Sequence, residues 1–132
     1  MDALRFSAVL LILAMACFMT ESTGVCDKDK VEGTGNLNLT RYFFDSDTET
    51  CETFIYRGGN SDTFPNRFNY HSVCENTCQC KLRKDTGHGE APRTRWYHSS
   101  DGSGCQSFQY LGSGGNANNF HTESECEMAC EL

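Results

Sequence analysis

The segment Cys74-Glu-Asn-Thr-Cys-Gln-Cys80 holds three cysteines within seven residues and decides how the chain is divided. Counted from Cys26, the next cysteines follow after 25, 23 and 4 residues. Counted from the last cysteine of the segment, they follow after 25, 21 and 4 residues and end at Cys130. The segment is therefore the end of one repeat and the beginning of a second, with Gln79 alone between them.

Other residues recur with the same spacing as the cysteines. Identical residues lie 54 positions apart at Lys30 and Lys84, Gly33 and Gly87, Gly35 and Gly89, Arg41 and Arg95, Phe54 and Phe108, and Tyr56 and Tyr110. After a two-residue length difference they lie 52 apart at Asn66 and Asn118, Phe68 and Phe120, and Glu75 and Glu127. The pattern predicts two copies of one domain, at residues 25–78 and 80–132, with residue 79 as the linker.

The N-terminus has the pattern of a secretion signal. Residues 6–19 are apolar apart from Ser7, too short a run to span a bilayer as a helix. The small residues Ser22 and Gly24 predict cleavage after Gly24, so that residues 1–24 are removed together with Cys17. Eight cysteines then enter an oxidising, extracellular compartment, which favours disulfides over a zinc site built from reduced thiols. The sequence predicts no metal and no cofactor.

Charge and composition exclude several classes of function. The chain has 11 Lys and Arg against 18 Asp and Glu, a net charge of −7, which argues against a nucleic-acid partner. Past the N-terminus no apolar run is long enough for stable membrane insertion. None of the four histidines stands in a Ser-His-Asp or Cys-His order with a nucleophile, so the sequence predicts no enzyme. Domains this small need disulfides for part of their stability.

Each repeat predicts two strands and a short helix. Residues 40–58 are rich in aromatic residues and threonine around a polar turn at 45–50, and residues 93–112 repeat this around a turn at 101–104. The stretch Thr122-Glu-Ser-Glu125 predicts a capping box, with Thr122 accepting from the first turn and Glu125 reaching back. The two cysteines that follow share one helix face and reach partners elsewhere, which leaves two of three connectivities open.

The stretch FQYLGSGGNANNFHTESECEMAC, residues 108–130, resembles the Phe-x-Tyr, Gly-Gly-Asn-x-Asn-x-Phe and Cys-x-x-x-Cys signature of the Kunitz inhibitor family. The resemblance covers residues 26–78 and 80–130. It implies a small disulfide-rich α+β fold with two Kunitz-like domains in tandem, each a twisted two-stranded hairpin with a C-terminal helix. The tandem arrangement is similar to that of tick salivary double-Kunitz proteins, among which anti-haemostatic roles are common.

The resemblance also implies the pairing of the cysteines and the place of two asparagines. The implied disulfides are Cys26–Cys78, Cys51–Cys74, Cys80–Cys130 and Cys105–Cys126. The asparagines Asn66 and Asn118 are expected to be buried, with their amides satisfying backbone groups.

The third disulfide of the family, which staples the protease-binding loop, has no counterpart in either repeat. Its first cysteine falls at Gly35 and Gly89, and its second at Ser113 and at Gly59 or Asn60. Loss of such a crosslink costs about 3 kcal/mol of stability in the chain-entropy model. Freeing four or five loop residues at roughly 1 kcal/mol each is expected to weaken binding by about a thousandfold.

The implied reactive loops carry unusual residues for inhibitors of trypsin-like proteases. They comprise Gly35, Asn36 and Leu37 in the first repeat and Gly89, Glu90 and Ala91 in the second. Asn36 and Glu90 occupy the position that enters the specificity pocket. Trypsin-like pockets carry an aspartate, which would repel Glu90. The expected partner is a serine protease of a host or prey, inhibited in an atypical way.

A glycosylation sequon, Asn38-Leu39-Thr40, lies two residues beyond Asn36. A glycan on Asn38 is expected to bar the first loop from an active-site cleft.

A basic patch in the second repeat supports an alternative function. It comprises Lys81, Arg83, Lys84, Arg93 and Arg95. The stretch CKLRK that begins at Cys80 loosely resembles the basic patch of Kunitz-type potassium-channel toxins. The alternative is therefore a modulator of an ion channel or cell-surface receptor, although short basic runs are also common as solvated faces.

Overall fold

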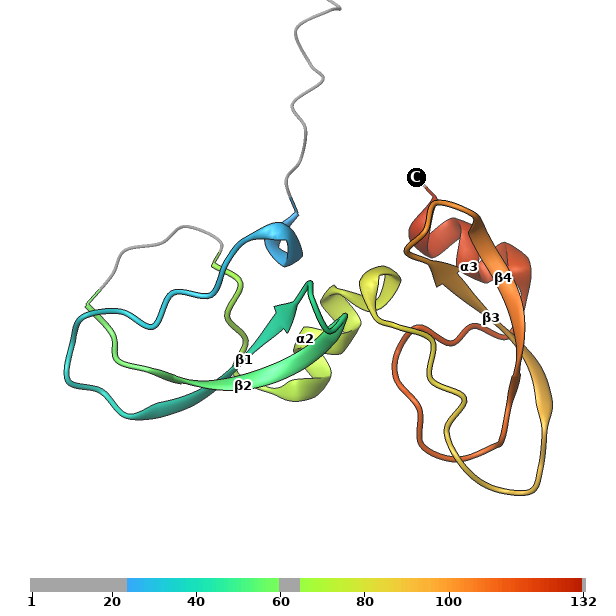
Figure 1. The fold of residues 1–132 in the computed structure, drawn as a ribbon, viewed down its shortest axis with the longest axis horizontal. Coiled ribbons are helices and arrows are strands. Elements are labelled where there is room, and N and C mark those ends of the chain that lie inside the picture. Colours follow the sequence, from blue (N-terminus) through green and yellow to red (C-terminus); the bar gives the residue numbers. More distant parts are fainter. Residues whose placement is uncertain (1–23, 60–64, 132) are drawn as a thin grey trace, which may run out of the picture.

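The computed structural model describes residues 24–59 and 65–131. The predicted signal segment therefore lies almost wholly outside the described residues. The first repeat contains η1 (Val25–Asp27), β1 (Leu39–Asp45), β2 (Thr50–Tyr56) and α2 (His71–Thr77), and the second contains η2 (Gln79–Lys81), β3 (Arg93–Ser99), β4 (Gly104–Tyr110) and α3 (Glu123–Cys130). Figure 1 shows the two hairpins on either side of the short helical segment that joins the repeats.

Each repeat is built on one antiparallel hairpin, as its aromatic and β-branched residues predicted. β1 pairs with β2 from Leu39 opposite Tyr56 to Asp45 opposite Thr50, and β3 pairs with β4 in the equivalent register. Equivalent aromatic pairs cross the two hairpins edge to face, each with ring centroids 5.6 Å apart: Phe43 with Phe54, and Tyr97 with Phe108. The turns lie between the strands at residues 46–49 and 100–103, each within one residue of the predicted ranges 45–50 and 101–104.

Two disulfides in each repeat, four in all, fix the helix to the rest of its own repeat. They join Cys26 to Cys78, Cys51 to Cys74, Cys80 to Cys130 and Cys105 to Cys126, which is the pairing that the resemblance implied. Two cysteines four positions apart stand in α3, and in the first repeat Cys74 lies in α2 and Cys78 is its C-cap. In each repeat one of the two is bonded to the hairpin and the other to the start of the repeat, so the helix is held at two points.

Two buried asparagines connect the hairpins to the segments around them. Asn118 is fully buried, accepts from His98 N at 2.8 Å and donates to Leu82 O at 2.7 Å and His98 O at 2.9 Å. Asn66 makes the equivalent bonds to Phe44 N, Phe44 O and Lys28 O. Both side chains are structural, as expected, because their amides satisfy backbone groups that would otherwise be buried without partners.

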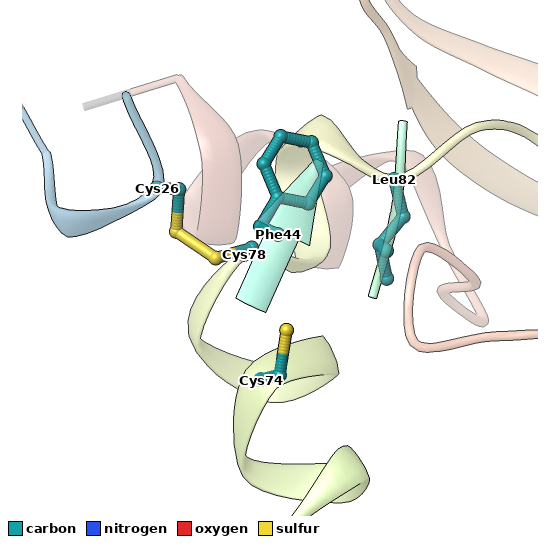
Figure 2. Packing of buried hydrophobic residues seen from close by; sticks show 5 residues of the cluster. All are labelled: Cys26, Phe44, Cys74, Cys78 and Leu82. Atoms are coloured by element: carbon teal, nitrogen blue, oxygen red, sulfur yellow. A yellow bond between two sulfur atoms is a disulfide. The ribbon is translucent and has the colours of Figure 1, made fainter. Parts of the chain in front are cut away.

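The packed core continues from the first repeat into the beginning of the second. Leu82, which is 2% exposed, belongs to the same buried cluster as Phe44, Cys26, Cys74 and Cys78. Figure 2 shows Phe44 between the Cys26–Cys78 disulfide and Leu82. The repeats are therefore joined by shared apolar packing as well as by the chain.

The capping of α3 differs in one bond from the prediction. Thr122 Oγ1 accepts from Glu125 N at 3.1 Å, as expected of the N-cap. The Glu125 carboxylate, however, accepts from His121 N at 2.9 Å, whereas the sequence predicted a bond to Thr122 N. Because the N-cap backbone is extended, the amide one residue earlier also lies within reach of this side chain.

Candidate functional site

The first candidate loop lies directly before β1 and runs beside the segment that follows β2. Gly35 N donates to Gly58 O, and Leu37 N donates to Arg57 O, each at 2.9 Å. Between these two bonds Asn36 is exposed, and Leu37 is 52% exposed. The loop therefore presents its tip to solvent while its backbone is tied to the neighbouring segment.

The two segments of the first loop approach more closely than side chains would allow. An ideal Cβ on Gly35 would lie 2.4 Å from Arg57 O, and one on Gly59 would lie 3.0 Å from the backbone N of Gly35. The structure thus places Gly59 beside Gly35 at the point where the family's crosslink would fall. The other candidate for that position, Asn60, lies outside the described residues.

The second candidate loop is tied at neighbouring positions. His88 N donates to Ser113 O at 2.8 Å and Ser113 N donates back to His88 O at 3.0 Å. Ala91 N donates to Leu111 O at 3.3 Å. Gly89 has a φ of +120°, which only glycine adopts readily, and Glu90 and Ala91 are exposed beyond it.

A hollow adjoins the first loop at the hairpin. It is lined by Asn36, Leu37, Asn38, Ile55 and Arg57. Ile55 and Leu37 are both exposed apolar side chains, so the hollow combines apolar surface with one cation. The sequon residue Asn38 is exposed at its edge. A glycan there would cover the surface that a protein partner of the first loop would touch.

The structure divides the predicted basic patch. Lys81 Nζ forms an ion pair with Asp27 of the first repeat. Lys84 Nζ lies 5.4 Å from the centre of the Tyr97 ring. The two arginines of β3, Arg93 and Arg95, are nearer the open end of the hairpin. There Arg95 stacks 5.9 Å from the Tyr110 ring and Arg93 is the strand partner of the same tyrosine.

The seam between the repeats is a set of contacts that the sequence did not predict. Besides the Asp27–Lys81 pair, Arg83 N donates to Glu49 O at 3.0 Å. A hollow of about 290 Å³ opens there, lined by both hairpin turns and by the residues that join the repeats. The two hairpin turns lie at the seam. Each loop adjoins the opposite end of its hairpin and therefore lies away from the seam (Figure 1).

The described part of the chain offers no sign of a metal centre or of a membrane span. Within residues 24–59 and 65–131, no three His, Cys, Asp or Glu residues are grouped so that they could hold a metal ion. Over the same residues, no helix has the length and apolar character needed to cross a bilayer.

Comparisons with known proteins agree with this architecture. The family model of the Kunitz/bovine pancreatic trypsin inhibitor domain matches residues 25–79 and again residues 79–131. Doenitin-1 of Haemaphysalis doenitzi is 31% identical over 93% of this chain and 96% of its own length. The carboxypeptidase inhibitor SmCI of Sabellastarte magnifica is 35% identical over 81% of this chain, which spans only 64% of that relative.

One solved structure is similar over almost its whole length. It is that of Ixolaris, determined with its interaction with Factor X. The similarity has a TM-score of 0.50 and 28% identity and covers 83% of this chain and 97% of that one. The tandem arrangement of two domains is therefore shared with a solved protein.

Proposed function

The chain belongs to the Kunitz/bovine pancreatic trypsin inhibitor family, and from this premise we propose that it is a secreted inhibitor of a serine protease of a host or prey. The observation that carries the proposal is the position of the two loops. Each lies exposed at the end of its hairpin opposite the turn, in a domain that matches the family model along its whole length. The protein acts by binding and not as an enzyme.

The inhibition is atypical. Asn36 and Glu90 occupy the tips of loops that lack the family's stapling crosslink. In a pocket that carries an aspartate, Glu90 would place two like charges together without water, which opposes binding. The target is therefore a protease with a different pocket, or one that is bound outside its active-site cleft.

Blood coagulation is the proposed setting. The similarity to Ixolaris, a protein whose structure was determined with its interaction with Factor X, supports a coagulation protease as the target class. The similarity to Doenitin-1 over nearly the full length of both chains supports a protein of two Kunitz domains. A two-domain inhibitor of a coagulation protease, with an anti-haemostatic role, is consistent with both similarities.

The alternative, a modulator of an ion channel or receptor, has less support. Its contact residues would be Lys81, Arg83 and Lys84, together with the arginines of β3. Lys81 is engaged by Asp27 within the protein, and Lys84 lies over an aromatic ring. A channel partner would have to compete for both charges.

A panel of coagulation and digestive proteases tests the proposal. We expect the full-length secreted protein to inhibit at least one coagulation protease at nanomolar concentration. If the second loop enters a pocket without an aspartate, Glu90→Ala should weaken that inhibition at least tenfold; if the protease is bound outside its active-site cleft, Glu90→Ala should leave it unchanged. Glu123→Ala, an equal change of charge at an exposed residue of helix α3, serves as the matched control and should have no effect. Silence across the panel, with channel currents that respond to the protein and not to a Lys81→Ala/Lys84→Ala variant, would favour the alternative.

A further inference from the structure

Each loop is tied to the segment after its own hairpin by two hydrogen bonds at equivalent positions. They run from Leu37 N to Arg57 O and from Arg57 N to Glu32 O in the first repeat, and from Ala91 N to Leu111 O and from Leu111 N to Thr86 O in the second. Because the paired residues are 54 positions apart, these bonds belong to the repeat itself. They are backbone bonds and do not depend on the side chain at either position.

A further connection differs between the repeats, and in each it joins one position that the resemblance assigns to the family's crosslink to a neighbour of the other position. In the first repeat it is the bond from Gly35 N to Gly58 O at 2.9 Å. In the second it is the reciprocal pair between His88 and Ser113, at 2.8 and 3.0 Å. Two residues that exchange both bonds are the closely spaced unit of an antiparallel ladder. We call the bonds of each repeat together the loop ladder.

Glycine is what allows the loop ladder to close in the first repeat. A Cβ on Gly35 would lie 2.4 Å from Arg57 O and 3.0 Å from the carbonyl carbon of Gly58. The φ of Gly35 is not positive, so its backbone conformation is open to other residues. A larger residue is excluded at this position because of the close approach of the two segments. Gly58 is buried beneath the Leu37 side chain, whose Cδ1 would be 2.8 Å from a Cβ on Gly58. The Leu37 side chain therefore covers Gly58.

We propose that the loop ladder takes the place of the absent crosslink and holds each loop in one shape before any partner binds. Gly35 and Gly58 are then positioning residues, which act through the backbone of Asn36 and Leu37. The inference deepens the proposed inhibitory function and rests on it for its consequence, which is that loops without a crosslink still bind at a low ordering cost. The ladder itself is measurable without any protease.

Amide hydrogen exchange on the intact two-domain protein tests the proposal. We expect the amides of Leu37, Ala91 and Ser113 to exchange at least tenfold more slowly than unprotected amides of the same sequence. In Gly35→Ala, protection at Leu37 should fall at least tenfold, while Tyr42 N, which donates to Phe68 O within the same repeat, keeps its protection. If the Tyr42 amide also lost its protection in Gly35→Ala, the variant would be unfolded. The protection of Leu37, Ala91 and Ser113 in the unaltered protein would then decide whether the ladder forms.

Gly102→Ala is the control for a glycine change elsewhere in the chain. Gly102 lies in the turn of the second hairpin at a φ of +84°, where alanine is strained, and a Cβ there would meet nothing within 4 Å. This variant should lose stability at its own turn and leave the Leu37 amide protected. Fast exchange at Leu37 and Ala91 in the unaltered protein, or equal protection at Leu37 in both variants, would overturn the proposal. Slow exchange together with silence in the protease panel would leave the ladder standing and reject the inhibitory function instead.

Discussion

Asp27 and Lys81 occupy the same position in the two repeats, 54 residues apart, and their side chains pair with each other across the seam. They meet because Cys78, which is bonded to Cys26, stands only two residues before Cys80. The residue after the first cysteine of each repeat is therefore brought to the same place. The two copies carry opposite charges at the position where they touch.

Reversing one of these charges should loosen the seam, and exchanging both should restore it. Asp27→Lys or Lys81→Asp alone would leave like charges adjacent, whereas the double exchange rebuilds the pair in the opposite sense. Because both side chains are largely exposed, we expect a coupling energy of about 0.2–1 kcal/mol. A double-mutant cycle on the urea-unfolding free energy measures it. Additive effects, with no recovery in the double variant, would show that the pair contributes nothing.

Leu82→Ala should destabilise the protein by about 2–5 kcal/mol, because it opens a cavity in the cluster shared with Phe44. The free energy of unfolding by urea provides the measurement. Leu39→Ala, at an exposed leucine of β1, is the control and should cost less than about 1 kcal/mol. If the two variants were equally stable, the apolar contact between the repeats would have to be discarded.

Asn118→Ala should cost at least about 3 kcal/mol, because it leaves the His98 backbone amide and two buried carbonyls without their partner. Asn36→Ala, at an exposed loop tip, should change stability by less than about 0.5 kcal/mol. Thermal unfolding of the two variants compares them. A small effect at Asn118 would mean that water replaces the amide.

Acid should remove a contribution to stability that Asp101 makes in the turn of the second hairpin. Hydrogen bonds from Ser103, first from its side chain and then from its backbone, and from Ser99 lower the pKa of Asp101 from 3.8 to about 2. A carboxyl group whose pKa is lower in the folded protein stabilises it above the unfolded pKa and loses that contribution as the pH falls. The loss should occur between about pH 4 and pH 2, and Asp101→Asn should remove this part of the pH dependence. Titration of the Asp101 carboxyl carbon by NMR checks the pKa, and a midpoint near 3.8 would contradict it.

The secreted protein should carry one N-linked glycan, at Asn38. Its intact mass should exceed that of the polypeptide and return to the polypeptide mass in both Asn38→Gln and Thr40→Ala, because each change destroys the sequon. Removal of the glycan should strengthen any binding by the first loop and leave the second unaffected. A mass equal to that of the bare polypeptide would reject the glycan and the steric block together.

The backbone hydrogen bonds of the loop ladder offset part of the ordering cost that the missing crosslink suggested for the loops. A crosslink closing a loop of this size contributes about 3 kcal/mol. The three or so backbone bonds that tie each loop contribute about 1 kcal/mol each. If the ladder forms, the loops do not move freely. The loss of affinity caused by the missing crosslink is then smaller than the value expected for freely moving loops. Where the sequence showed only missing cysteines, the structure has glycines that let the backbones meet.

Three features of the fold have no signature in the sequence. Lys81, a member of the predicted basic patch, pairs with Asp27, and Leu82 is buried in a core that both repeats share. The Glu125 carboxylate accepts from the His121 amide and not from the N-cap amide of a standard capping box. Each depends on contacts that periodicity and composition do not encode. The predicted boundaries of the two domains stay predictions, although the family model divides the chain at Gln79 as well.

The sequence by itself determined the repeat and the hairpins, because cysteines and aromatic residues recur at offsets of 54 and then 52 around polar turns. The resemblance that its local signature carries implied the two buried asparagines. Only the tertiary structure decided how the copies touch and what ties their loops. Those contacts join residues such as Asp27 and Lys81, or Gly35 and Gly58, which are distant along the chain and carry no pattern of their own. Their meeting depends on where disulfides and packing place the backbone, and that is a property of the folded chain.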